Sequence, residues 1–162
     1  MVTVHTSQPS GAEQRLYDLN IKLPVAPVPL GAYVEVVQTG RLLFLSGMLP
    51  IFEGQLQFIG QIGAELTVEE GRKAATIACL NGIAIVREYL GSLDKVSRVV
   101  RLGVSMVTTS DFREHPKIAD AASEMLIQVF GKEKISTRLI VGVTSLPLGA
   151  PIALEIIFET EP

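Results

Sequence analysis

Cysteine is almost absent from this chain of 162 residues, in which Cys79 stands alone. A single thiol excludes an internal disulfide and a zinc site built from several cysteines. Cys79 falls within an alanine-rich stretch that predicts a helix, which favours a buried and inert thiol. The N-terminus has neither the basic flank nor the apolar stretch of a secretory signal. We therefore expect a protein of the reducing cytoplasm.

Histidine is nearly as scarce, with His5 near the N-terminus and His115 in the first turn of a predicted helix. Neither stands near carboxylates at the spacing of a metal site or of a Ser-His-Asp triad. We expect no metal, and we interpret His115 as a solvent-facing side chain. The glycine-rich motifs that bind nucleotide phosphates are also missing, so we expect no cofactor.

Neither sign of charge is in large excess, because 14 Lys and Arg residues stand against 17 Asp and Glu residues. The basic residues are scattered, which disfavours nucleic acid as a partner. Apolar runs are short and are broken by Gly, Pro or charged residues, which argues against a membrane span. Hydrophobic residues make up 48% of the chain, a share that excludes disorder and predicts one globular domain.

Strand and helix signals alternate along the chain and predict an α+β domain. Thr67 and Glu70 match a capping box, and Gly91 is placed for a left-handed helix end. We assign residues 1–29, an N-terminal helix and a connector, to the same domain as residues 30–162. The predicted elements are a helix over 10–19 capped by Ser10, a proline-rich connector over 24–29, a hairpin of 32–37 and 42–46, one short strand near 56–59, a helix over 67–91, a strand over 96–109, a helix over 111–130, and closing strands over 137–144 and 152–159.

Apolar side chains occur on both parities of three predicted strands, in residues 42–45, 139–141 and 154–158. Two helices can cover only one face of a sheet, and a face in water should carry polar residues at alternate positions. The other face therefore needs a second cover. Self-association is the simplest source of one. The alternative is that local twist buries the extra apolar residues.

Arg138 lies inside an otherwise apolar strand, Thr-Arg-Leu-Ile-Val-Gly-Val. A half-buried guanidinium needs an anionic partner, because leaving it unpaired away from water is costly. One candidate partner is the carboxylate of a ligand, which matches the guanidinium fork. The other is a structural carboxylate, either Glu155 or one from a neighbouring subunit. Tyr33, at the start of the first strand, offers a hydroxyl to a ligand or serves only in packing.

The run from Arg138 to Glu155, with Leu-Pro-Leu-Gly-Ala-Pro inside it, resembles the signature of the RidA family, also called YjgF-like. Gly31-Ala32-Tyr33, the run Leu-Phe-Leu-Ser-Gly-Met-Leu-Pro that ends at Pro50, and Asp111-Phe112 follow in that family's order. The resemblance covers roughly residues 30–160. The extra N-terminal helix and the proline-containing loop are similar to the branch labelled chorismate-mutase-like or L-PSP endoribonuclease.

The resemblance implies a chorismate-mutase-like fold of the bacillus type, with a mixed sheet and two long helices on one face. It further implies a homotrimer in which the sheets form a central barrel, with a cleft between each pair of subunits. Family members hydrolyse reactive enamines and imines, such as 2-aminoacrylate, to 2-oxo acids and ammonia. In them, an Arg at the position of Arg138 binds the substrate carboxylate and a Tyr at the position of Tyr33 lines the pocket.

Three positions depart from the family's pattern. Ala153 replaces the Glu that positions the attacking water, which leaves Glu155 two residues further along the same strand face. Ile140 replaces a common cysteine, and Asp120 replaces a common asparagine. Glu155 and Asp120 are then the candidates for activating water at a site that binds a small carboxylate-bearing metabolite. The alternatives are a non-catalytic binder of small carboxylates and, less favoured by the acidic composition, an endoribonuclease.

Overall fold

The computed structural model describes residues 10–162, so residues 1–9, which include His5, lie outside the described part. Three helices and seven strands are described, together with three short 3-10 turns. In chain order they are α1 (Ala12–Asp18), β1 (Val36–Thr39), β2 (Leu42–Leu45), β3 (Ile51–Phe52), β4 (Gln55–Leu56), α2 (Val68–Leu90), η1 (Leu93–Lys95), β5 (Val96–Val107), α3 (His115–Phe130), η2 (Lys132–Lys134), β6 (Thr137–Val143), η3 (Pro147–Gly149) and β7 (Ile152–Thr160).

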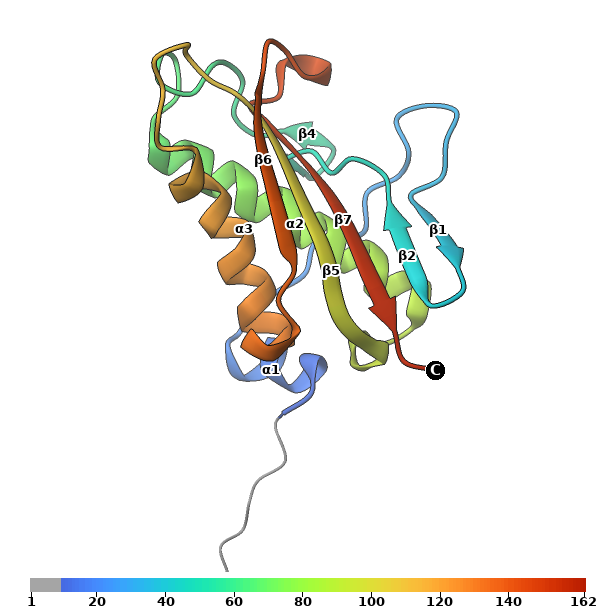
Figure 1. The fold of residues 1–162 in the computed structure, drawn as a ribbon. Helices are drawn as coiled ribbons and strands as arrows, with labels where there is room; N and C mark the ends of the chain where they lie inside the picture. The colour runs from blue at the N-terminus through green and yellow to red at the C-terminus, as the bar shows by residue number, and fades with distance from the viewer. Residues whose placement is uncertain (1–9) are drawn as a thin grey trace, which may run out of the picture.

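Five strands form the main sheet, in the order β1-β2-β7-β5-β6. β5 and β6 are parallel and are connected through α3, whereas the other neighbouring pairs are antiparallel. β1 and β6 are therefore the two edges of the sheet. Figure 1 shows α2 passing behind the sheet and α3 lying beside β6. The predicted α+β fold, with a mixed sheet and two long helices on one face, is confirmed.

Helix α2 has the ends that its sequence predicts. The Thr67 hydroxyl accepts a hydrogen bond from the Glu70 backbone N–H at 3.2 Å, and the Glu70 carboxylate accepts one from the Thr67 N–H at 2.8 Å. The bond from the Thr67 N–H, with a second from the Thr67 hydroxyl at 2.9 Å, stabilises the ionised Glu70 carboxylate and holds the pKa of this carboxyl below the ordinary value. At the other end, Gly91 adopts a φ of +77°, which a residue with a side chain rarely takes.

The core lies between α2, α3 and one face of the sheet. On β7 the side chains of Ile152, Leu154, Ile156 and Phe158 alternate toward the helices, and all four are at most 1% exposed. Small residues let α2 approach them closely: a Cβ added at Gly82 would lie 3.1 Å from the Ile156 side chain. Burial of these four side chains gives about 1.5 to 3 kcal/mol each, which makes β7 the centre of the core.

The face of the sheet opposite α2 and α3, which we name the open face, has no cover from residues 10–162. Phe44 is 39% exposed, Leu139 is 51% exposed and Val141 is 41% exposed. Local twist does not bury these side chains, so the predicted need for a second cover stands. By strand, the open face consists of Val37 and Thr39 (β1), Leu42 and Phe44 (β2), Ala153, Glu155, Ile157 and Glu159 (β7), Arg98, Arg101, Gly103, Ser105 and Val107 (β5), and Thr137, Leu139, Val141 and Val143 (β6).

The prediction that Ser10 caps the first helix is wrong. The N-cap of α1 is Gly11, and the first turn is capped from elsewhere in the chain, since the Asp94 carboxylate accepts a hydrogen bond from the Glu13 N–H at 3.1 Å. Glu13 in turn forms an ion pair with Arg87 at 2.8 Å. These contacts fix α1 beside α2 and η1, with Leu16 in the common core.

Three boundaries also differ from the prediction. The first strand begins at Val36 rather than residue 32, and α3 begins at His115 rather than residue 111, because Pro116 suits the first turn of a helix. In place of one strand near residues 56–59, β3 and β4 form a two-residue hairpin. Glu53 and Gly54 at its turn have φ values of +51° and +75°, as in the tight turns that join short antiparallel strands.

Candidate functional site

The candidate site is the seam between β6 and α3, where three side-chain positions of β6 face the helix layer. Arg138, Ile140 and Gly142 are in register with Leu102, Val104 and Met106 of β5, all of which are buried toward the helices. Side chains paired across a ladder share a face. Arg138 therefore points to the helix side of an edge strand, where it is protected on one side and accessible from beyond the edge.

Arg138 is held by two side chains of α3. Its Nη1 donates to Asp120 Oδ1 at 2.8 Å and to Ser123 Oγ at 3.1 Å. Asp120 and Ser123 are three residues apart and so lie on one face of the helix. The Arg138 side chain is 26% exposed and that of Asp120 is 48% exposed, so water reaches the pair. The structural carboxylate that the sequence requires is Asp120, and the suggested partner Glu155 is wrong for this chain.

One side of the Arg138 guanidinium remains available. Both hydrogen bonds use Nη1, and neither Nε nor Nη2 has a partner among residues 10–162. Two parallel N–H groups of a guanidinium match the two oxygens of a carboxylate. Asp120 and Ser123 thus orient a fork that can bind a further carboxylate, and Ile140 makes the neighbouring position on β6 apolar.

His115 is half-buried at the end of the same seam, which corrects its interpretation as a solvent-facing side chain. Its Nε2 lies 3.3 Å from Thr108 Oγ1, and its ring contacts Phe112 edge-to-face with centroids 5.0 Å apart. The ring packs over Gly142, where an added Cβ would be in van der Waals contact with Nε2 at 3.4 Å. These contacts account for His115 as a packed side chain beyond the carboxyl end of β5.

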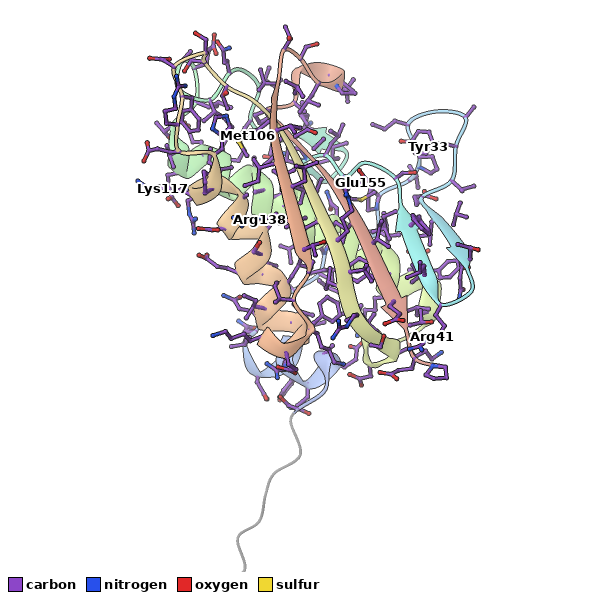
Figure 2. The ribbon with its side chains drawn as sticks, viewed as in Figure 1. Tyr33, Arg41, Met106, Lys117, Arg138 and Glu155 are labelled. Atoms are coloured by element: carbon purple, nitrogen blue, oxygen red, sulfur yellow. The ribbon has the colours of Figure 1, made fainter. Side chains whose placement is uncertain are left out.

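Tyr33 lies at the opposite edge of the sheet from Arg138 (Figure 2). It precedes β1, is 47% exposed, and its hydroxyl accepts a hydrogen bond from the Leu30 N–H at 3.0 Å. Four strand spacings of about 4.8 Å separate β1 from β6, or about 19 Å. Tyr33 and Arg138 of one chain therefore do not meet around a small ligand.

Glu155 and Ala153 lie on the open face, on the other side of the sheet from Arg138. Glu155 is in register with Gly103 and Ala153 with Ser105. The Glu155 carboxylate leans over Gly103, where an added Cβ would lie 3.5 Å from Oε2. Of the two carboxylates considered from the sequence, Asp120 is thus beside Arg138 and Glu155 is not.

Other reactive groups are few. Burial of Cys79 raises the pKa of its thiol to about 12, so the thiol stays protonated near neutral pH. Among residues 10–162, no three His, Cys, Asp or Glu side chains are grouped as metal ligands. No helix in that part of the chain is long and apolar enough to cross a membrane.

Comparison with known proteins extends the likeness to nearly the whole chain. Residues 13–160 match the family model described as "YjgF/chorismate mutase-like, putative endoribonuclease". Protein TCP17 of Trypanosoma cruzi is 39% identical over 145 residues, which are 89% of this chain and 91% of that protein. A protein of Dermatophagoides farinae named 2-iminobutanoate/2-iminopropanoate deaminase is 32% identical over 146 residues, which cover 87% and 95% of the two chains.

Solved structures share the fold. A protein from Shewanella oneidensis described as a "putative endoribonuclease" superposes with a TM-score of 0.88 at 32% identity, over 93% of this chain and 99% of that one. E. coli TdcF with bound serine has a TM-score of 0.61 at 21% identity, over 84% and 94% of the two chains, and supports the fold alone. With its family model matched from α1 to β7, the chain belongs to the YjgF/chorismate mutase-like family.

Proposed function

We propose that this protein hydrolyses reactive enamines and imines of the 2-aminoacrylate type to 2-oxo acids and ammonia, at sites formed between copies of the chain. The observation that carries this function is the Arg138 guanidinium, held on one side by Asp120 and Ser123 and open on the other. The D. farinae relative, named as a 2-imino acid deaminase, supports the same chemistry.

Arg138 binds the carboxylate of the substrate in this proposal. The Nε and Nη2 groups donate to the two oxygens of its carboxylate, which fixes the adjacent imine carbon a few ångströms from the guanidinium. Ile140 lies on the same side of β6 and offers an apolar contact to the substrate side chain. A positively charged group beside the substrate also favours the anionic acid over neutral amines.

Asp120 is the group that we assign to the activation of water. Its Oδ1 holds Arg138, and its Oδ2 accepts no hydrogen bond from residues 10–162. As water adds to the imine carbon, the carboxylate accepts a proton from it and returns that proton to nitrogen. The hydroxyl proton of the resulting carbinolamine then moves to the amino nitrogen as the C–N bond breaks, which releases ammonia and leaves the 2-oxo acid. An enamine substrate enters this sequence after a proton has moved from its nitrogen to its methylene carbon, which gives the imine. Glu155 reaches the same substrate only if it comes from another copy.

A homotrimer completes the site in this proposal. Arg138 and Tyr33 are on opposite edges of the sheet, so the β6 edge of one copy beside the β1 edge of the next brings the two side chains together. The same ring covers the apolar open face. Tyr33 then lines the pocket that Arg138 anchors.

A non-catalytic binder of small carboxylates is the second candidate function. It is favoured by Ala153, which stands where the family's catalytic Glu is expected, and it uses the same Arg138 fork. An endoribonuclease is disfavoured, because His115 is packed against Thr108 and Phe112 and is not presented as a general base.

Ammonia release from 2-aminoacrylate generated in situ tests the function directly. The wild-type protein is expected to accelerate release, Arg138→Ala to lose the acceleration, and Arg113→Ala to keep it, since the Arg113 side chain bonds only nearby loop carbonyls. If the wild-type protein releases ammonia only at the uncatalysed rate but still binds a 2-oxo acid in calorimetry, the non-catalytic binder is the remaining function. If the wild type shows neither accelerated ammonia release nor binding of a 2-oxo acid, Arg138 does not bind a substrate carboxylate.

A further inference from the structure

Two side chains of opposite charge lie among the apolar residues of the open face. Arg101 comes from β5 and Glu155 from the neighbouring β7. The register pairs Arg101 with Ile157 and Gly103 with Glu155, so the two charged residues are diagonal neighbours on one face. Among residues 10–162 they form no ion pair with each other, and neither has another charged partner within 4.0 Å. A second pair of charged residues, Arg98 and Glu159, lies further along β5 and β7, where Glu159 forms an ion pair with Arg41.

A bulge in β5 places Arg101 on this face. Val99 pairs with Phe158 and is buried toward the helices, and in a regular strand Arg101, two residues on, would point the same way. The register shifts between Val99 and Arg101, which turns the arginine out of the core. Its Nε is nevertheless buried and has no hydrogen-bond partner in the described part of the chain. An oxygen from outside the chain cannot reach an atom that is already closed to water, so a partner would have to meet the Nη groups of Arg101.

Glu155 is the complementary group. It is exposed in the single chain, and its carboxylate lies close over Gly103, whose missing side chain leaves it room on the surface of the sheet. Its carboxylate forms no ion pair with any cation among residues 10–162. Any cover laid over the apolar residues around it removes water from this carboxylate, which then needs a cation.

We propose that Arg101 of one copy pairs with Glu155 of another across the open face, and that this ion pair fixes the register in which the copies assemble. A second copy is the occupant that the charges favour, because one face carries both signs and is thereby complementary to itself. Nucleic acid would leave Glu155 opposed by phosphate, and an apolar partner would leave both charges unpaired. Glu155 accordingly belongs to the contact between copies rather than to the water-activating group.

Neutral and reversed charges at the two positions test this pairing. Sedimentation velocity over a range of micromolar concentrations would compare wild type with Arg101→Met, Glu155→Gln, Arg101→Glu, Glu155→Arg and the double reversal Arg101→Glu/Glu155→Arg. Each single change is expected to weaken assembly by about 100-fold, and the double reversal is expected to restore most of it. Arg113→Met, away from the open face, is the matched control and should assemble as wild type does.

The outcomes separate this pairing from the proposed function, on whose intersubunit assembly it rests. If the wild type assembles, and Arg101→Met and Glu155→Gln dissociate at the same concentration as the wild type does, the pairing is overturned and the intersubunit site remains. A double reversal no stronger than the single reversals would overturn it as well. A monomeric wild-type protein would remove both. Urea unfolding of each variant below its assembly concentration shows whether a weakened oligomer reflects a misfolded chain.

Discussion

Arg138 on β6 and Tyr33 before β1 lie at opposite edges of one five-stranded sheet, about 19 Å apart across it. A small carboxylate bound to Arg138 is therefore beyond the reach of Tyr33 from the same chain. The two residues meet only where the edge of one copy adjoins the opposite edge of another. Under the proposed function, catalysis therefore requires at least two copies of the chain.

Asp120→Asn separates substrate binding from the chemical step. The amide oxygen still accepts from Arg138, so binding of a 2-oxo acid should change little, whereas kcat should fall by about 100-fold or more because the proton acceptor is lost. Steady-state kinetics with 2-aminoacrylate measure kcat, and calorimetry measures the binding of the 2-oxo acid. Asp111→Asn is the control, because Asp111 is exposed before α3 and its side chain forms no ion pair with residues 10–162. An unchanged kcat would assign water activation to another group.

Arg138→Lys keeps the charge and removes the fork. Lysine donates as a point charge and cannot bind both carboxylate oxygens in parallel, so the Kd for pyruvate should rise by about 10-fold or more. Isothermal titration calorimetry measures this change, with Arg113→Lys as the matched control. Equal affinities for wild type and Arg138→Lys would show that charge alone holds the ligand.

The capping box should give α2 a pH-dependent contribution to stability. Thr67→Ala is expected to lower the free energy of unfolding by about 1 kcal/mol. Glu70 has a folded pKa below its unfolded value, so its contribution is complete above the unfolded pKa and is lost as pH falls through the folded one. Urea unfolding should therefore show that wild type and Glu70→Gln differ at neutral pH and converge in acid. A constant difference would contradict the cause assigned to the shift.

Cys79 should be unreactive in the native protein. Its thiol is fully buried, and burial raises its pKa to about 12, so reaction with an aromatic disulfide reagent at pH near 8 requires opening of the helix layer. Absorbance should show slow labelling in buffer and rapid labelling of one thiol in urea. Rapid stoichiometric labelling of the native protein would mean that α2 opens far more readily than this core suggests.

Structural features that depend on a few consecutive residues could be predicted from the sequence. Thr67, Glu70 and Gly91 define the ends of α2 by themselves, and the apolar run over residues 152–158 identifies β7, whose alternating burial only the structure shows. The cap of α1 was missed because its acceptor, Asp94, is 81 residues from Glu13. No local pattern records a contact of that kind.

The site was only partly predictable for the same reason. Arg138 in an apolar strand indicated a carboxylate partner, but the choice of Asp120 over Glu155 depends on which face of the sheet each residue occupies. Arg101 shows how parity fails, since a bulge after Val99 turns it to the open face against the period of the strand. The two-sided apolar strands indicate that the open face needs a cover, but they do not indicate which edges of two copies would meet.

Mixing two inactive variants tests the intersubunit site most directly. Arg138→Ala and Tyr33→Ala would be dissociated, combined in equal amounts and allowed to reassemble, and deamination of 2-aminoacrylate would be measured before and after. If each site takes Arg138 from one copy and Tyr33 from another, roughly a quarter of the sites in the mixture become intact and activity returns to about that share of wild type. Activity that stays at the level of the separate variants, in oligomers shown to be mixed, would contradict a site shared between copies.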